Sequence, residues 1–189
     1  MGLFSKQMER ARKGFVIPEH ARLCRTLGFG LHSYLAVLPR ALESLGMRRV
    51  AADPLVRHGL LSTARVRISA IPGYAFIDTR TPCICLSWVY YKLGTGLDLY
   101  LDLLHELTHL RQLQEGADLW DRHFSYVDRI TEIEGYAVAV EEGRRLGMTE
   151  TELARHLHNP WMSARDVTRL QHHIDDFLAR AGPPPQVER

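Results

Sequence analysis

Residues 97–114 read LDLYLDLLHELTHLRQLQ and contain the strongest helical pattern of the chain. Its leucines recur at helical spacing and cover most of the circumference of the expected helix. They are Leu99, Leu101, Leu103, Leu104, Leu107 and Leu110. A helix that is apolar on nearly all sides is usually buried in the centre of a domain. The sequence therefore predicts a central, buried helix that ends near Gly116.

The same helix carries an HExxH motif, His105-Glu106-Leu107-Thr108-His109. Residues four apart lie on one face of a helix, so the two imidazoles can bind one cation. Glu106 lies about 100° around the helix from His105, where its carboxylate can hold a water molecule and accept its proton. Zinc lowers the pKa of such a water to about 7, which makes it a nucleophile at neutral pH. The alternative is a pair of core histidines bonded to backbone carbonyls.

A catalytic zinc site needs a third protein ligand and one open position. The next predicted helix offers Glu132 and Glu134, which point to different faces, so that only one of them can reach the metal. We predict Glu134, because its small neighbours Gly135 and Ala137 would let two helices approach closely. In the alternative, Thr131-x-x-Glu134 is a capping box that directs the Glu134 carboxylate to the backbone.

Three further groups are candidates for the site. Asp102 lies three residues before His105 on the same helix face, where it could orient a histidine or stand exposed at the rim of a cleft. Tyr126 is the predicted hydrogen-bond donor to the oxyanion of a tetrahedral intermediate. Cys83 and Cys85 share one face of a predicted strand, but no second cysteine pair completes a metal site, so we expect structural thiols.

The rest of the chain predicts an α+β fold, in which strands come first and helices follow. Short links between the predicted strands favour a small, mainly antiparallel, three-stranded sheet. These strands cover residues 65–70, 74–79 and 83–91. Period and capping signals predict one or two helices within residues 19–46 and three more after the central helix. The later helices run from Asp128 or Thr131 to Gly147, from Thr149 to Asn159, and from Ser163 to about Arg180.

The domain prediction has three parts. Residues 1–60 form an N-terminal helical extension, residues 61–181 a catalytic domain, and residues 182–189, with three consecutive prolines, a disordered tail. A chain of 189 residues with 46% apolar and 24% charged side chains has ordinary globular composition.

Charge and cysteine content exclude several classes of protein. The formal net charge of +2 gives no reason to expect binding to nucleic acid or to an anionic membrane. No apolar run approaches the roughly 20 residues of a membrane span. The first 14 residues lack the apolar core of a signal peptide. Three cysteines make no disulfide framework, and free thiols fit a reducing compartment, so we expect a cytoplasmic protein.

The HELTH run resembles the gluzincins, zinc peptidases that combine HExxH with a glutamate on a following helix. A closer likeness is to the minigluzincins, small archaeal zincins, and to related bacterial proteins, over about residues 68–170. The segments that carry it are His105-Glu-Leu-Thr-His-Leu-Arg-Gln, Tyr126-Val-Asp, Glu132-Ile-Glu134-Gly-Tyr, Arg145-Leu-Gly-Met and the segment around Trp161. Val138 departs from the gluzincin pattern, which has an aspartate at this position.

The resemblance implies a zinc metalloendopeptidase in which His105, His109 and Glu134 bind Zn²⁺ and Glu106 activates a zinc-bound water. It also implies a minimal zincin-like fold whose edge strand borders the cleft. A peptide or protein substrate could pair with that edge, here residues 83–87. Some members of the group are latent, with a terminal segment over the cleft, so a zymogen is a further expectation. The missing aspartate motivates the alternative, a zinc-stabilised binding or regulatory domain with little or no peptidase activity.

Overall fold

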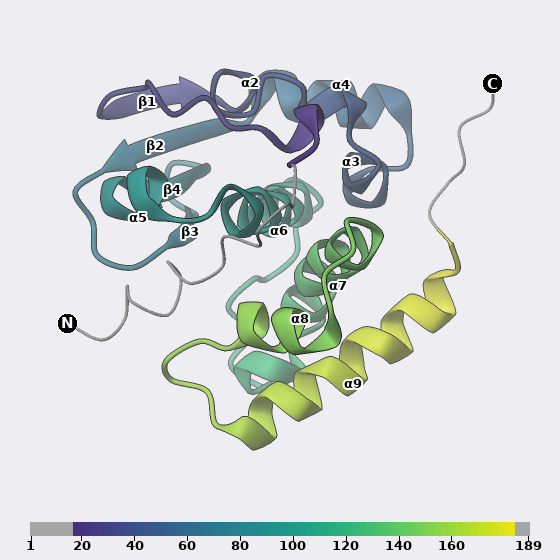
Figure 1. Cartoon of the computed structure of the whole chain (residues 1–189). Coiled ribbons are helices and arrows are strands. Elements are labelled where there is room, and N and C mark those ends of the chain that lie inside the picture. The colour runs from purple at the N-terminus through teal and green to yellow at the C-terminus, as the bar shows by residue number, and fades with distance from the viewer. Residues whose placement is uncertain (1–16, 184–189) are drawn as a thin grey trace.

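Helix α6, Gly96–Gln114, runs through the middle of the computed structural model, which describes residues 17–183 (Figure 1). Thr95 caps the helix by accepting a hydrogen bond from the backbone N–H of Asp98. Just beyond the helix, Gly116 takes a φ of +84°, a conformation that glycine adopts without strain. Thirteen of the nineteen helical residues are buried, which confirms the predicted central helix.

Four strands form one mixed sheet in the order β1-β2-β4-β3. They are β1 Gly30–Ser33, β2 Arg65–Ser69, β3 Ala75–Asp78 and β4 Cys83–Ser87. The outer pairs β1/β2 and β3/β4 are antiparallel, whereas the central pair β2/β4 is parallel. The α+β prediction is confirmed. The three-stranded, mainly antiparallel sheet is wrong in detail, because β1 adds a strand and β4 pairs with β2 as well as with β3.

The sheet order also corrects the predicted substrate edge at residues 83–87. Strand β4 is hydrogen-bonded on both sides, so its backbone groups are not free to pair with a peptide. The edge strands of the described sheet are β1 and β3, and β3 lies next to helix α6.

Residues 19–46 form short elements instead of the predicted helices. They comprise the 3-10 turn η1 Glu19–Ala21, strand β1, helix α2 Tyr34–Val37 and the 3-10 turn η2 Ala41–Glu43. The leucine spacing misleads here, because Gly30 has a φ of +134°, which no right-handed helix contains. Helices α3, Gly46–Val50, and α4, Pro54–Thr63, complete the N-terminal part.

The N-terminal part shares its core with the rest of the chain. The fully buried Tyr34 donates a hydrogen bond from its hydroxyl to the backbone carbonyl of Leu103 on α6, at 3.1 Å. Tyr100 on α6 contacts Ser44, and helix α3 packs against α6 and α7. The described residues of the predicted extension are therefore built into the same core. Most of the predicted tail, residues 184–189, lies outside the described residues.

The chain after β4 is helical. Helix α6 lies between the sheet and a layer of later helices (Figure 1). The remaining elements are α5 Trp88–Leu93, the 3-10 turn η3 Tyr126–Asp128, α7 Ile130–Arg145, α8 Glu150–Leu157 and α9 Ala164–Ala181. Within residues 17–183, no helix is both long and apolar enough to cross a bilayer.

The predicted strand over residues 83–91 is half wrong, because it ends at Ser87 and the chain turns into α5. Consecutive residues Tyr90 and Tyr91 are both buried while Val89 is exposed. In this helix Tyr90 contacts Tyr74 and Asp102, whereas Tyr91 contacts the backbone of Cys24. Packing therefore overrides the β propensity of this segment.

Helices α8 and α9 each begin with a capping box, at the predicted helix starts Thr149 and Ser163. Thr149 accepts a hydrogen bond from Glu152 N–H while the Glu152 carboxylate accepts one from Thr149 N–H, and Ser163 and Asp166 repeat this arrangement. Each box satisfies backbone donors that a helix cannot satisfy internally.

We expect Thr149→Ala to lower the free energy of unfolding by about 1 kcal/mol, because it removes the acceptor that caps α8. Urea unfolding followed by circular dichroism measures the change. Thr168→Ala is the matched control, since Thr168 is exposed inside α9 and bonds only to the Ala164 carbonyl of its own helix. An equal loss of stability in both variants would contradict the capping role.

Candidate metal centre

Helices α6 and α7 bring three metal-ligating side chains together, namely His105, His109 and Glu132. The Oε2 atom of Glu132 lies 3.4 Å from Nε2 of His105 and 3.5 Å from Nε2 of His109. The two imidazole rings are perpendicular, with centroids 4.5 Å apart. All three residues are buried, with 5–7% of their surface exposed.

The spacing of these three atoms fits a small cation. Two ligands that each lie about 2.0–2.1 Å from a tetrahedral zinc ion are about 3.3–3.4 Å apart. The buried Oε2 atom of Glu132 has no hydrogen-bond partner within the described residues, although a buried carboxylate oxygen normally has one. A cation bound between this oxygen and the two imidazole nitrogens would provide the missing partner. The group could therefore hold a metal ion.

Glu134, the predicted third ligand, lies elsewhere. Arg111 donates a hydrogen bond to its Oε1 atom at 2.5 Å, and Gln112 donates one to its Oε2 atom at 2.7 Å. It does not cap the helix either, because α7 begins at Ile130 without a side-chain cap. The structure therefore places Glu132, and not Glu134, beside the two histidines.

The reason for this correction is the direction of each side chain around the helix. Successive helical residues are rotated by about 100°, so Glu132 and Gly135 share a face while Glu134 points elsewhere. A Cβ atom at Gly135 would lie 2.9 Å from Nδ1 of His105, which shows that Gly135 marks the face of α7 that touches the motif. Gly135 does mark the close approach of the two helices. The glutamate that this approach brings to the histidines is Glu132, one turn earlier, and not the adjacent Glu134.

Gln112 fixes the orientation of His109. The side-chain amide nitrogen of Gln112 donates hydrogen bonds to the Thr131 carbonyl at 3.1 Å and to Glu134 at 2.7 Å. Its Oε1 atom therefore faces Nδ1 of His109, at 2.8 Å, and accepts the proton of that nitrogen. This leaves Nε2 of His109 directed at Glu132, as a metal ligand requires. Glu134 acts here as a support for Gln112.

His105 is oriented by packing. Its Nδ1 atom has no hydrogen-bond partner in the described structure and lies against the backbone of α7 at Gly135. The ring of Tyr136 covers it, with a centroid distance of 4.3 Å. Metal-ligating histidines usually donate their second N–H to a carboxylate or carbonyl, whereas the ring of His105 is held by its contacts with Gly135 and Tyr136.

Burial and mutual contact set the charges of the three side chains. Burial, together with the neighbouring His109, lowers the pKa of His105 to about 4, so this imidazole is neutral at pH 7. Burial also acts to lower the pKa of His109, but contact with Glu132 outweighs it and raises this pKa to about 9. Burial opposes ionisation of Glu132, yet the two histidines hold its pKa well below the usual range. A bound cation would displace the proton on the Nε2 atom of His109.

Glu106 has the environment of a general base. It is buried beside the ligands, with 8% of its surface exposed, and burial raises the pKa of its carboxyl to about 8. A carboxylate whose pKa lies near neutrality can accept a proton and later return it.

Tyr126, the predicted oxyanion donor, lies beside the three ligands. Its hydroxyl is 2.8 Å from the hydroxyl of Tyr136, whose ring covers His105. Asn159, in the loop between α8 and α9, donates a hydrogen bond to the Tyr136 hydroxyl at 2.8 Å. Burial and the nearby charges of Tyr136 and Glu132 keep the pKa of Tyr126 well above its usual value. Tyr126 is therefore protonated at pH 7 and can donate a hydrogen bond.

Asp102 belongs to a neighbouring polar cluster. It accepts a hydrogen bond from the Tyr90 hydroxyl, and its Oδ1 atom lies 3.5 Å from Nε2 of His156. The other ring nitrogen of His156 lies 3.2 Å from Oδ1 of Asp98. This cluster joins α8 to α6 one turn before His105. No sequence pattern predicts this cluster, because His156 stands on a short helix far along the chain.

Comparisons with family models, with curated proteins and with solved structures found no match to this chain.

The assignment of Glu132 predicts different zinc contents for two glutamine variants. We expect Glu132→Gln to weaken zinc binding at least about 100-fold, because it removes a charged ligand from a buried site. Glu134→Gln should bind close to one zinc ion, since its carboxylate contacts Arg111 and Gln112. Native mass spectrometry after zinc titration measures both. The assignment fails if Glu134→Gln loses the ion and Glu132→Gln keeps it.

Gly135→Ala should weaken metal binding about 10–100-fold, because the added methyl group would lie 2.9–3.0 Å from the His105 ring and displace it. Gly59→Ala is the control, since a Cβ atom at this exposed position of α4 meets nothing within 4 Å. That control should be slightly more stable than the wild type, because alanine favours a helix. Competition with a zinc-chelating dye gives the affinities, and equal values for all three proteins would contradict the close approach of α7.

Proposed function

We propose that this protein is a zinc-dependent metallopeptidase of gluzincin type. The observation that carries the proposal is the buried Glu132 oxygen that faces two HExxH imidazoles at 3.4 and 3.5 Å. Two histidines and one carboxylate are a common ligand set of zinc peptidases, which keep a fourth position for water or substrate. When bound, zinc would supply a Lewis acid that polarises a carbonyl and lowers the pKa of water.

Two side chains of the site would act on the proton and on the developing charge. Glu106 takes a proton from the attacking water and passes it to the leaving amine, a function that matches its raised pKa. Tyr126 donates a hydrogen bond to the oxygen on which negative charge develops. Its hydroxyl is held by Tyr136, so it is oriented before substrate arrives.

A peptide strand is the substrate that fits the edge of the sheet. Strand β3 is an edge strand that lies next to α6, and Phe76 in its middle is exposed. An extended peptide can add to such an edge through backbone hydrogen bonds. The peptide would then lie along the side of the helix that carries the HExxH motif.

The burial of the site favours a second candidate function, a zinc-stabilised binding or regulatory domain. His105, Glu106, His109 and Glu132 expose only 5–8% of their surface, and the Asn159 loop contacts Tyr136 above them. A buried site suits a structural ion, which is enclosed by protein. It also suits a latent peptidase, in which the loop at Asn159 must move before substrate binds.

The substitution Glu106→Gln separates these functions. It keeps the shape of the side chain and leaves the three ligands in place, so the variant should bind zinc like the wild type. Its cleavage of a denatured protein substrate should fall about 10²–10⁴-fold, because the proton acceptor is lost. Glu115→Gln, on the exposed end of the same helix, controls for the loss of a negative charge.

Quantitative peptide mass spectrometry on zinc-loaded protein gives the cleavage rates. Cleavage by Glu106→Gln at the wild-type rate would refute the mechanism. A wild type that binds one zinc ion and cleaves nothing, even after Asn159→Ala loosens the loop, would support the binding or regulatory function.

A further inference from the structure

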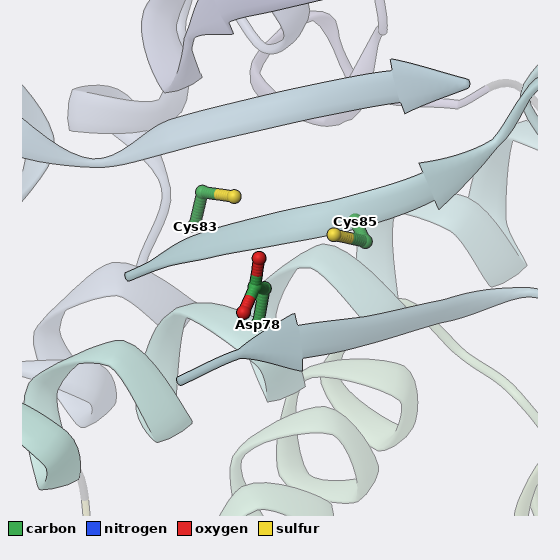
Figure 2. A group of neighbouring side chains, drawn as sticks. All are labelled: Asp78, Cys83 and Cys85. Carbon is green, nitrogen blue, oxygen red and sulfur yellow. The ribbon is translucent and has the colours of Figure 1, made fainter. Parts of the chain in front are cut away.

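A second group of metal-ligating side chains lies on the sheet, apart from the histidine site. The thiols of Cys83 and Cys85 and the carboxylate of Asp78 have donor atoms within 4.8 Å of one another. Figure 2 shows the two sulfur atoms directed toward each other, with the Asp78 carboxylate beside them. Cys83 and Cys85 come from β4, and Asp78 is paired directly with Cys83 across the β3/β4 ladder.

The position of the two thiols within the sheet is unusual. Side chains alternate along a strand, so Cys83 and Cys85 lie on the face opposite to Ile84 and Leu86, which fill the core. Nevertheless the cysteines expose only 2% and 5% of their surface. Two buried thiols and a partly exposed carboxylate therefore converge at one place on the sheet.

Arg67 can balance the net negative charge of a metal ion bound by the two thiolates and the Asp78 carboxylate. It lies opposite Cys85 on β2 and donates a hydrogen bond to Oδ2 of Asp78 at 3.2 Å. Two thiolates and one carboxylate around a divalent ion carry a net charge of −1, which the guanidinium of Arg67 neutralises. Buried charges are tolerated when they are paired in this way. Arg67 also donates to the Thr81 hydroxyl at 3.0 Å, and this hydroxyl donates to Oδ2 of Asp78 at 2.6 Å.

The Cys85 thiol is protonated at neutral pH when no ion is bound. Burial and the neighbouring Cys83 raise the pKa of Cys85 to about 11. Metal ions bind the thiolate, so binding must release protons and becomes tighter as the pH rises. A raised pKa also makes a thiol slow to oxidise.

An open cavity beside the cluster provides access. It has a volume of about 570 Å³ and is lined by Arg67, Asp78 and Cys85, with the exposed side chains of Phe76 and Trp120 at its rim. An ion can enter from this side, and a water molecule can complete a tetrahedral set of four ligands.

We propose that Asp78, Cys83 and Cys85 form a second metal site, which takes a thiophilic divalent ion such as zinc or cadmium. Thiolate ligands select such ions over magnesium and calcium. The site is independent of the proposed peptidase function, since it shares no residue with the histidine site. The two cysteines alone did not predict this site. The third donor, Asp78, lies on the neighbouring strand β3, and only the pairing of β3 with β4 places it beside Cys83.

Cadmium titration of the full chain tests this proposal. Binding to thiolates produces a ligand-to-metal charge-transfer band in the ultraviolet, which histidine and carboxylate ligands do not give. The band should develop in the wild type and in Glu132→Gln, whose histidine site is impaired. It should also develop in Cys24→Ser, because Cys24 is the third cysteine and lies outside the cluster. It should be lost in the double variant Cys83→Ser/Cys85→Ser.

Two results would overturn the proposal. One is a wild type that develops no band in excess cadmium at pH 8. The other is a band that survives in the folded double variant and vanishes in Cys24→Ser. If circular dichroism shows that the double variant does not fold, Asp78→Asn and Cys83→Ala replace it. Each should weaken cadmium binding about 10-fold or more, and unchanged affinity in both would also refute the site.

Discussion

The candidate centre depends on one close contact, the approach of the α7 backbone to the ring of His105 at Gly135. A side chain of any size at this position would collide with the imidazole. The same approach places Glu132, one turn earlier, opposite both histidines of the motif. It also allows Tyr136 to cover His105 from above. One residue without a side chain therefore sets the distance on which the geometry of the site depends.

The buried charges of the site explain why so many polar groups surround it. Glu132 and the histidines stabilise each other's charge states in a place where water cannot. The amide of Gln112 then connects His109 to Glu134, and Arg111 pairs with Glu134 in turn. This chain of contacts leads from the buried His109 to the partly exposed carboxylate of Glu134. The carboxylate of Glu134, which looked like a ligand, serves at the outer end of this network.

Short sequence patterns predicted the helices whose formation depends on neighbouring residues. The leucine pattern of α6, the HExxH motif and the capping boxes at Thr149 and Ser163 each lie within a few residues, and the structure contains the corresponding helices. Contacts between distant segments could not be predicted in this way. The parallel pairing of β2 with β4 depends on where the β3 hairpin lies, and the strand at Gly30 is stabilised by its partner β2. Which of Glu132 and Glu134 faces the histidines depends on how α7 is rotated about its axis relative to α6. The spacing of residues along one helix does not determine this rotation.

The hydrogen bond between Asn159 and Tyr136 has a consequence for the energetics of access. A single hydrogen bond of this kind contributes about 0.5–1.5 kcal/mol net, because water replaces it when it breaks. That free energy corresponds to an equilibrium constant of only about 2–12 between the held and released states of this contact. A closure that rested on this bond alone would be populated in both states at room temperature. Entry to the centre would then be a graded property of the loop, which a small change in its sequence could shift, rather than an all-or-none event.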